Sequence, residues 1–390
     1  MQALEEPLWC ALMTKRRLHP PPSQARTPPQ PSHPLARRLL DWYDQNKRDL
    51  PWRAAHDTIP QPYHIWLSEI MLQQTTVAAV KPYYEKFLRL FPDLPALAHA
   101  PSAAVMHAWA GLGYYSRARN LHACAQQIVK NYQGQFPDTL EQLRALPGIG
   151  DYTAAAILSI AFHKRAVVMD GNVERVISRL YRITTPLPQA KKEIKTHLEP
   201  LTPHRRPGDF AQSMMDLGAT VCTPRNPACS LCPLNQACLS AGRDDVESFP
   251  RKAPKKTRPV RFGHAFVLMR KDGALLLRTR PSQGLLGGMT ELPTSAWIDQ
   301  PCDADPEALI PFKAAWQLAP APVRHIFTHF ELNLSVHAAH LSSNPKIASP
   351  WRFVAQEALS QEALPSVMKK VLNAGLSLSA RPQQPKSRSL

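Results

Sequence analysis

Apolar residues recur at intervals of three and four from about residue 36 to residue 241, between short Pro and Gly breaks. This spacing is typical of helices that bury one face. After residue 261 the pattern changes. F-V-L-M-R, the turn K-D-G and A-L-L-L-R-T-R predict a β-hairpin, and H-I-F-T-H-F-E-L-N-L-S-V-H alternates as a strand does. We therefore expect a mainly α-helical domain followed by a smaller α+β domain.

The polar segments between and beyond these patterns set the predicted boundaries. Residues 1–35 include a Pro-rich tract without apolar periodicity, which predicts a disordered extension. The stretch R-K-A-P-K-K-T-R-P-V-R has six basic residues and no acid, so 242–261 is predicted to be a basic linker. The two domains are then 36–241, with a cysteine loop at 222–238, and 262–365. Residues 366–390 are predicted to be a C-terminal tail.

The charge of the chain favours a polyanionic partner. Its 390 residues carry 47 Lys and Arg against 30 Asp and Glu, a net charge of +17, which suits nucleic acid or an anionic membrane surface. On charge alone, an ordinary basic enzyme is an alternative. No run of eighteen apolar residues is present, and the N-terminus has no continuous apolar core, so we expect a protein inside the cell. In a reducing compartment, clustered thiols are more often metal ligands than disulfides.

Four of the seven cysteines lie within seventeen residues, in the spacing C-x6-C-x2-C-x5-C. They are Cys222, Cys229, Cys232 and Cys238. Four thiolates without a histidine suit either structural zinc or an iron–sulfur cluster, and the number of ligands does not choose between them. The usual zinc pattern has two C-x-x-C pairs, whereas this loop has one.

Upstream, L-P-G-I-G predicts a turn between a helix ending near Leu146 and a second helix. Gly148 and Gly150 would let backbone amides approach an anion closely, and the second helix would present its N-terminal N–H groups. Such a hairpin can grip a DNA phosphate without reading the base sequence. A plain helix connection is the alternative for this motif by itself.

Two acidic residues have the settings that a paired acid and anion need. Asp170, in M-D-G-N-V-E-R-V, precedes a helical pattern, and as a helix cap it would accept N–H bonds that keep it ionised. Glu69 lies in a helix predicted over Tyr63–Val80 that is apolar nearly all round, so burial would keep it protonated. A structural, hydrogen-bonded Glu is the alternative. One protonated and one ionised carboxylate are what cleavage of a glycosidic bond requires, and in DNA the target base must also be flipped out.

Taken together, the motifs resemble the adenine DNA glycosylases of the MutY family over about Ala36 to Glu357. In the order of that family the chain contains L-P-W-R, W-L-S-E-I-M-L-Q-Q-T, G-L-G-Y-Y-S-R-A-R-N, L-P-G-I-G, D-G-N-V and the four-cysteine loop. The resemblance implies a helix-hairpin-helix fold and a [4Fe-4S] cluster on the cysteines. It also implies hydrolysis of adenine mispaired with 8-oxoguanine or guanine in double-stranded DNA, as the start of base excision repair. We expect a monomer without a membrane partner, in the cytoplasm at the nucleoid.

The resemblance also implies roles for individual residues. Glu69 would protonate N7 of adenine and later help activate water, Asp170 would stabilise the cationic sugar, and Tyr152 and Asn172 would assist around it. The positions that match the adenine pocket are Arg48, Leu50, Trp52, Arg53 and Gln212. The positions that match residues wedged into the duplex and against 8-oxoguanine are Gln74, Thr75, Leu112 and Tyr114. The strand-cleaving branch of the superfamily has a nucleophilic lysine where this chain has Tyr152, so a monofunctional glycosylase is implied.

The second domain contains R-T-R-P-S-Q-G-L-L-G-G-M-T-E-L-P, which resembles the start of a Nudix domain, but no R-E-x-x-E-E helix follows. Without that acidic cluster nothing would hold Mg²⁺ on a pyrophosphate. Recognition rather than hydrolysis is therefore expected. The resemblance to the family's C-terminal domain implies that this domain recognises 8-oxoguanine, with Phe327, Thr328 and His329 at the place of the family's F-S-H element.

Two alternatives remain from the sequence. One is another glycosylase of the superfamily, either endonuclease III-like or acting on T opposite G. Tyr152 disfavours a lyase, and the Nudix-like domain disfavours both. The other is a non-catalytic iron–sulfur DNA-binding protein, which the presence of both Glu69 and Asp170 disfavours.

Overall fold

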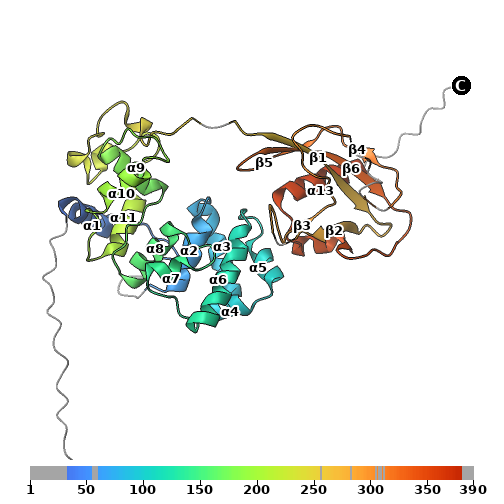
Figure 1. Cartoon of the computed structure of the whole chain (residues 1–390), viewed down its shortest axis with the longest axis horizontal. Helices are drawn as coiled ribbons and strands as arrows, with labels where there is room; N and C mark the ends of the chain where they lie inside the picture. Colours follow the sequence, from blue (N-terminus) through green and yellow to red (C-terminus); the bar gives the residue numbers. More distant parts are fainter. Residues whose placement is uncertain are drawn as a thin grey trace, which may run out of the picture. The chain divides into compact units, whose positions relative to one another are not determined.

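The computed structural model describes residues 33–54, 60–254, 257–281, 283–303, 305, 310 and 312–379. A helical domain comes first in the chain and a domain built on a sheet follows, as the apolar pattern predicts (Figure 1). The predicted N-terminal extension lies outside the described residues up to residue 32, and so does the predicted tail from residue 380.

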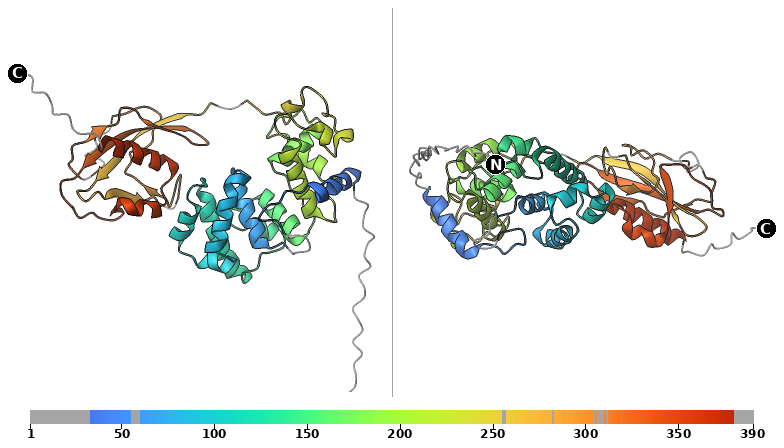
Figure 2. Two further views of the ribbon diagram at one scale, coloured as in Figure 1. Left: turned by 180° about the vertical axis from the view of Figure 1, so that it is seen from behind. Right: turned by 90° about the horizontal axis from the view of Figure 1, so that it is seen from below.

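The helical domain has two hydrophobic cores. One is formed mainly by α2 to α8 and contains Trp66, Phe87 and Trp109. The other is formed by α1 and α9 to α11 and contains Leu39 and Ile177. Figure 2 shows α1 beside the green and yellow helices of this second group. The helices are α1 (Pro34–Asn46), α2 (Pro62–Leu72), α3 (Val77–Leu90), α4 (Leu94–His99), α5 (Ser102–Trp109), α6 (Ser116–Tyr132), α7 (Leu140–Arg144), α8 (Asp151–Phe162), α9 (Gly171–Leu180), α10 (Lys191–Leu198) and α11 (Pro207–Thr220).

The helix predicted over Tyr63–Val80 is broken, and the prediction is wrong at residues 73–76, between α2 and α3. The helix α2 ends at Leu72, and Gln74 has the left-handed φ of +58°. Thr76 then caps α3 by accepting a hydrogen bond from the backbone N–H of Ala79 at 3.4 Å. The turn and the cap coincide with four consecutive polar residues, Gln73 to Thr76, and they place Gln74 and Thr75 on a loop.

The second domain is one mixed sheet with the strand order β3-β2-β1-β6-β4. Its strands are β1 (Val260–Met269), β2 (Leu275–Thr279), β3 (Thr290–Glu291), β4 (Gln317–Leu318), β5 (Val323–Ile326), β6 (Glu331–His340) and β7 (Trp351–Val354). The predicted hairpin of β1 and β2 is present, whereas β1 and β6 pair in parallel from Val260↔Glu331 to Met269↔His340. Burial alternates along β6, which explains its period-two pattern.

The predicted tail, 366–390, is wrong for its first half. Ser366–Ser379 form the helix α13, and Val367, Met368 and Val371 are fully buried against the sheet. Their spacing of one, three and four residues places them on one face of a helix. The α+β domain therefore extends at least to Ser379.

The predicted linker, 242–261, also begins too early. Phe249 is only 1% exposed, and its carbonyl accepts a hydrogen bond from Arg179 of α9 at 3.2 Å. The backbone N–H of Ala253 donates to the carbonyl of Leu187 at 3.2 Å. An aromatic anchor and backbone pairing therefore fix this stretch to the helical domain as far as Ala253.

Candidate active site

Glu69 is buried on α2, a helix that is apolar on almost every side. Glu69 is only 7% exposed, and one of its carboxyl oxygens accepts a hydrogen bond from the Tyr152 hydroxyl at 2.6 Å. Burial raises the pKa of Glu69 to about 7; the hydrogen bond from Tyr152 and the charge of Arg53 act against the shift, and the charge of Asp170 adds to it. Near neutral pH a large share of the protein molecules therefore carry a protonated carboxyl here, as a general acid requires.

Asp170 stands directly before α9 and caps it. One carboxylate oxygen accepts the backbone N–H of Val173 at 2.7 Å, and the other accepts the side-chain amide of Asn172 at 2.9 Å. The predicted helix cap is therefore present. Both carboxylate oxygens thus accept hydrogen bonds at the N-terminus of α9, where a negative charge is favoured.

Four helices bring the acid, the anion and a tyrosine together. Tyr152 lies in the first turn of α8, which packs on α2 and on α11, and α11 packs on α9. Burial, and then the charges of Glu69 and Asp170, raise the pKa of Tyr152 well above its usual value, so its hydroxyl stays a donor. At Gly218 of α11 a Cβ would lie 2.6 Å from the Cβ of Asn172, so glycine permits the close packing that sets the start of α9.

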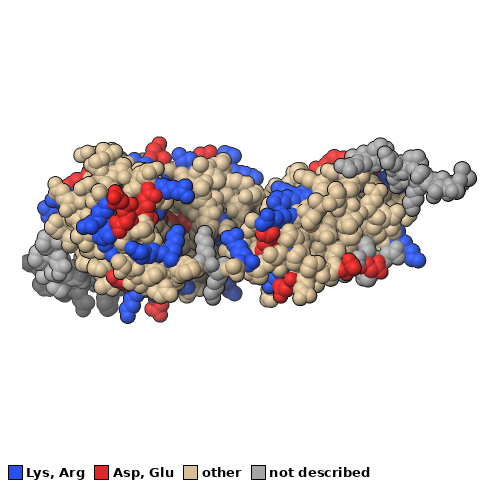
Figure 3. Space-filling model, turned by 90° about the horizontal axis from the view of Figure 1, so that it is seen from above, with Lys and Arg blue, Asp and Glu red and all other residues tan. Residues whose placement is uncertain are grey.

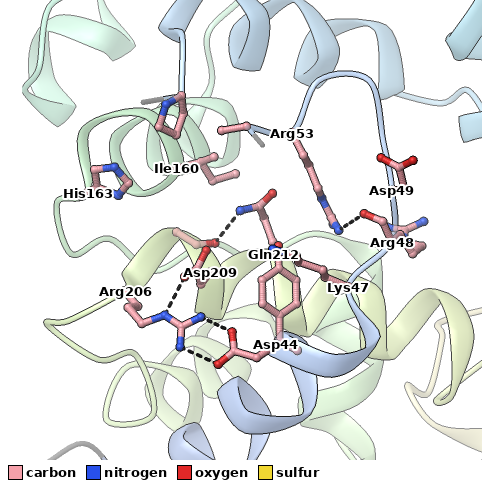
Figure 4. A pocket seen from close by; sticks show the side chains of 14 residues that line it. Asp44, Lys47, Arg48, Asp49, Arg53, Ile160, His163, Arg206, Asp209 and Gln212 are labelled. Carbon is pink, nitrogen blue, oxygen red and sulfur yellow. Dashed lines mark hydrogen bonds and ion pairs between the residues drawn. The ribbon is translucent and has the colours of Figure 1, made fainter. Parts of the chain in front are cut away.

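The residues predicted to line an adenine pocket separate into two groups. Arg48, Arg53 and Gln212 line one pocket, and Figure 4 shows Gln212 between Arg53 and Ile160. Leu50 and Trp52 are instead buried in the hydrophobic core, where the Trp52 ring packs edge-on against Tyr84 at 5.4 Å. Neither of the two lines this pocket.

The predicted wedge residues lie on two loops that one buried arginine joins. Arg117 of α6 donates to the carbonyl of Leu112 at 3.1 Å and to the Thr75 hydroxyl at 3.2 Å. It also donates to carbonyls at the end of α2, including that of Ile70 at 2.8 Å. Tyr114 is 48% exposed on this surface, whereas Leu112 is 7% exposed. Sequence reasoning missed Arg117, because its partners are mostly backbone carbonyls that no residue pattern reveals.

The turn between α7 and α8 has one glycine that the fold itself requires. Gly148 has a φ of +76°, and a Cβ there would lie 2.7 Å from the Cβ of Asn120. Gly150 has an extended backbone, and a Cβ there would meet nothing within 4 Å. The packing of the chain does not demand this second glycine, which leaves the N–H groups at the start of α8 open to an approaching group.

The four loop cysteines surround one small cavity after α11. Cys222, Cys229, Cys232 and Cys238 all line it. Within the described ranges, no three His, Cys, Asp or Glu side chains converge closely enough to hold a single metal ion. Four thiols around one cavity can bind either an iron–sulfur cluster or a zinc ion. Burial raises the pKa of the Cys232 thiol to about 12, so a cationic metal core is needed to stabilise a thiolate there.

Two arginines of α9 attach this loop to the helical domain. Arg179, 1% exposed, donates to the carbonyl of Thr223 at 2.7 Å and lies 3.4 Å from the Cys222 sulfur. Arg175 donates to the carbonyl of Cys222 at 2.8 Å and to the side-chain oxygen of Asn172 at 2.9 Å. Because Asn172 in turn donates to Asp170, hydrogen bonds run without a break from the loop to the capping carboxylate.

In the sheet domain, the predicted recognition element forms the tip of the β5–β6 hairpin. The backbone N–H of Phe327 donates to the carbonyl of Phe330 at 2.9 Å, and their rings stack at 4.8 Å. Thr328 and His329 are exposed between them. The nearby buried Glu291 is paired with Arg278 at 2.6 Å and also with Arg280, so it is not available to a metal.

Three families match successive parts of the chain. The HhH-GPD superfamily of base excision DNA repair proteins matches residues 67–204, the iron-sulfur binding domain of endonuclease III matches 222–238, and the NUDIX domain matches 264–374. Human adenine DNA glycosylase is 36% identical over 85% of this chain and 72% of its own length. The mouse protein is 37% identical over 85% and 76%, and that of Buchnera aphidicola from Acyrthosiphon pisum is 39% identical over 63% and 69%.

The chain belongs to the adenine DNA glycosylase family. It is a base-excision-repair enzyme that acts on DNA, and the family resemblance, the two-domain fold and the iron–sulfur cluster predicted from the sequence are confirmed. A non-catalytic DNA-binding protein and structural zinc are thereby set aside. No helix in the described part of this glycosylase is long and apolar enough to cross a membrane.

Replacement of Cys232 by Ser in the glycosylase is expected to abolish the broad visible absorption, at about 400 nm, of a thiolate-bound iron–sulfur centre. The matched control is Cys302→Ser, because Cys302 is an exposed cysteine outside the loop, and this variant should keep the full absorption. Spectra and iron content of the purified full chains measure the effect. A colourless wild-type protein that contains zinc would contradict the assignment.

Proposed function

We propose that this glycosylase removes adenine paired with 8-oxoguanine or guanine, with Glu69 as the acid and Asp170 as the stabilising anion, and leaves the strand uncut. The observation that carries the proposal is the buried Glu69 carboxyl, with its pKa near 7, next to the Tyr152 hydroxyl and the charge of Asp170. A protonated acid beside an anion is the pair needed to cleave a glycosidic bond.

In the proposed reaction, Glu69 donates its proton to N7 of the flipped-out adenine. The C–N bond then breaks, its electron pair leaves with the neutral base, and the sugar becomes an oxocarbenium ion that the Asp170 carboxylate stabilises. Water adds to the sugar, and the Glu69 carboxylate takes the proton that this water loses. The tyrosine hydroxyl at position 152 donates to Glu69 and cannot form an imine with the sugar, so a free abasic site is the product.

We expect both domains to contribute contacts with DNA. Lys and Arg side chains gather around a hollow on one face of the helical part, with acidic side chains among them (Figure 3). The amides at the start of α8, which no side chain caps, would bind backbone phosphate, and the loops of Thr75 and Tyr114 would enter the duplex where the base leaves. The exposed Thr328 and His329 would contact 8-oxoguanine. The net charge of +17 supports a nucleoid-bound enzyme, which we propose acts as a monomer in the cytoplasm.

The test uses four duplexes, which contain A opposite 8-oxoguanine, A opposite G, T opposite G, and thymine glycol. We expect the first two to give strand breaks only after alkali, because the proposed reaction makes an abasic site and no nick. Breaks without alkali would contradict the monofunctional assignment. Excision of thymine or thymine glycol, with no product from the first duplex, would contradict the proposed substrate.

A further inference from the structure

Asp216 on α11 is a completely buried carboxylate that binds two arginines of the base pocket. Its two oxygens accept the Arg53 guanidinium in a bidentate pair, at 2.7 Å each, and also accept the backbone N–H of Arg48 at 3.0 Å and its Nε at 2.6 Å. Arg53 also donates to the carbonyl of Arg48 at 2.9 Å (Figure 4). One side chain therefore fixes both guanidinium groups and the backbone between them.

Asp216 is charged in this site. Burial opposes the charge, yet the hydrogen bonds and positive charges of Arg53 and Arg48 outweigh it and hold the pKa of Asp216 below its usual value. Besides Asp216, the titratable groups that act on Arg53 are Glu69 and Tyr43, whose ring lies 5.7 Å from the Arg53 guanidinium carbon. The arrangement keeps the positive charge of Arg53 compensated at a short distance.

Arg53 is also one of three groups that act electrostatically on Glu69. The others are Tyr152 of α8, which donates a hydrogen bond, and Asp170 before α9, whose negative charge favours the protonated carboxyl. A positive charge at Arg53 favours the ionised carboxylate, which cannot donate a proton. Because the Asp216 carboxylate is paired with Arg53, it offsets part of the positive charge that acts on Glu69.

We propose that Asp216 is a positioning residue for adenine excision, which holds Arg48 and Arg53 against the base and compensates the Arg53 charge so that Glu69 remains protonated. This inference rests on the proposed role of Glu69 as the acid. Asp216 itself does not line the pocket, so it acts through the two arginines.

The experiment measures the pH dependence of adenine excision by the full chain at subsaturating concentrations, where the profile reports the free enzyme. In Asp216→Asn we expect the alkaline limb of the profile, where the rate falls as the pH rises, to move to lower pH by about one unit. The reason is that an uncompensated Arg53 charge favours the ionised form of Glu69. In Arg53→Met we expect the limb to move to higher pH. A variant that is merely less stable would excise adenine more slowly, but its alkaline limb would stay in place. Shifts of the limb in opposite directions in these two variants would therefore indicate an electrostatic effect.

Two further variants complete the design. Asp216→Glu keeps the charge and should keep the wild-type limb, even where altered geometry slows excision. Leu217→Ala removes a fully buried neighbour on the same helix without touching the ion pair, and it should leave the limb in place. A limb that stays at its wild-type position in both Asp216→Asn and Arg53→Met overturns the inference. If Asp216→Asn does not fold, the direction of the shift in Arg53→Met decides. A wild-type enzyme without an alkaline limb would instead contradict the proposed role of Glu69.

Discussion

Glu69→Gln is expected to lower the single-turnover rate of adenine excision by a factor of about 10²–10⁴, the usual contribution of a general acid, and to leave the affinity for the mispaired duplex nearly unchanged. Glutamine has the same size and still offers Tyr152 an oxygen acceptor, so the packing around α2 should persist. It has no proton to give to the base at any accessible pH. Excision kinetics and duplex binding, measured on the same preparation, separate chemistry from recognition.

The matched control is Glu193→Gln, because Glu193 is an exposed acid on α10. The same chemical change there should leave both excision and binding at wild-type values. Near-normal excision by Glu69→Gln would remove Glu69 from the acid role. A variant that loses binding and excision together would assign Glu69 to structure instead.

Asp170→Asn is expected to lower the excision rate by a factor of about 10²–10³, because the neutral amide cannot stabilise a cationic sugar as an anion does. Asparagine caps helices about as well as aspartate, so α9 should keep its start and the protein its stability. Asp170→Ala removes charge and cap together, and should lower the free energy of unfolding by about 1 kcal/mol as well. Excision rates and thermal unfolding distinguish the two contributions.

The control for this change is Asp93→Asn, because Asp93 caps α4 through the backbone N–H of Ala96 at 2.7 Å and has no assigned part in the chemistry. Its excision rate should equal that of the wild type. A slow Asp93→Asn, or an Asp170→Asn that excises adenine at the normal rate, would contradict the electrostatic role of Asp170.

The parts of the site that could be predicted each have a local signal. Asp170 directly precedes a helical pattern, and Glu69 interrupts an apolar helix, so neighbouring residues indicate the cap and the burial that the structure shows. The cysteine loop was predictable for the same reason, because its four ligands lie within seventeen residues. Short-range patterns determine these features, and the fold only brings them together.

The features that were missed depend on contacts between distant residues. Asp216 meets Arg53 across 163 residues, and nothing near either one indicates the partner. Arg117 binds carbonyl groups, which every residue has. The break after α2 and the helix α13 did have local signals, because Gln73 to Thr76 are polar and the apolar residues of α13 have helical spacing. The contacts of Asp216 and Arg117, by contrast, cannot be predicted from helix propensity or apolar spacing along the chain.

The central claim is that a protonated Glu69 starts the reaction, and the pH dependence of adenine excision by the wild-type enzyme tests it most directly. The substrate is a duplex with A opposite 8-oxoguanine, at subsaturating concentrations. Since burial raises the pKa of Glu69 to about 7 and only the protonated form donates, the rate should be high at about pH 6 and fall as the pH rises through about 7. A rate that stays constant up to about pH 9 would contradict the account.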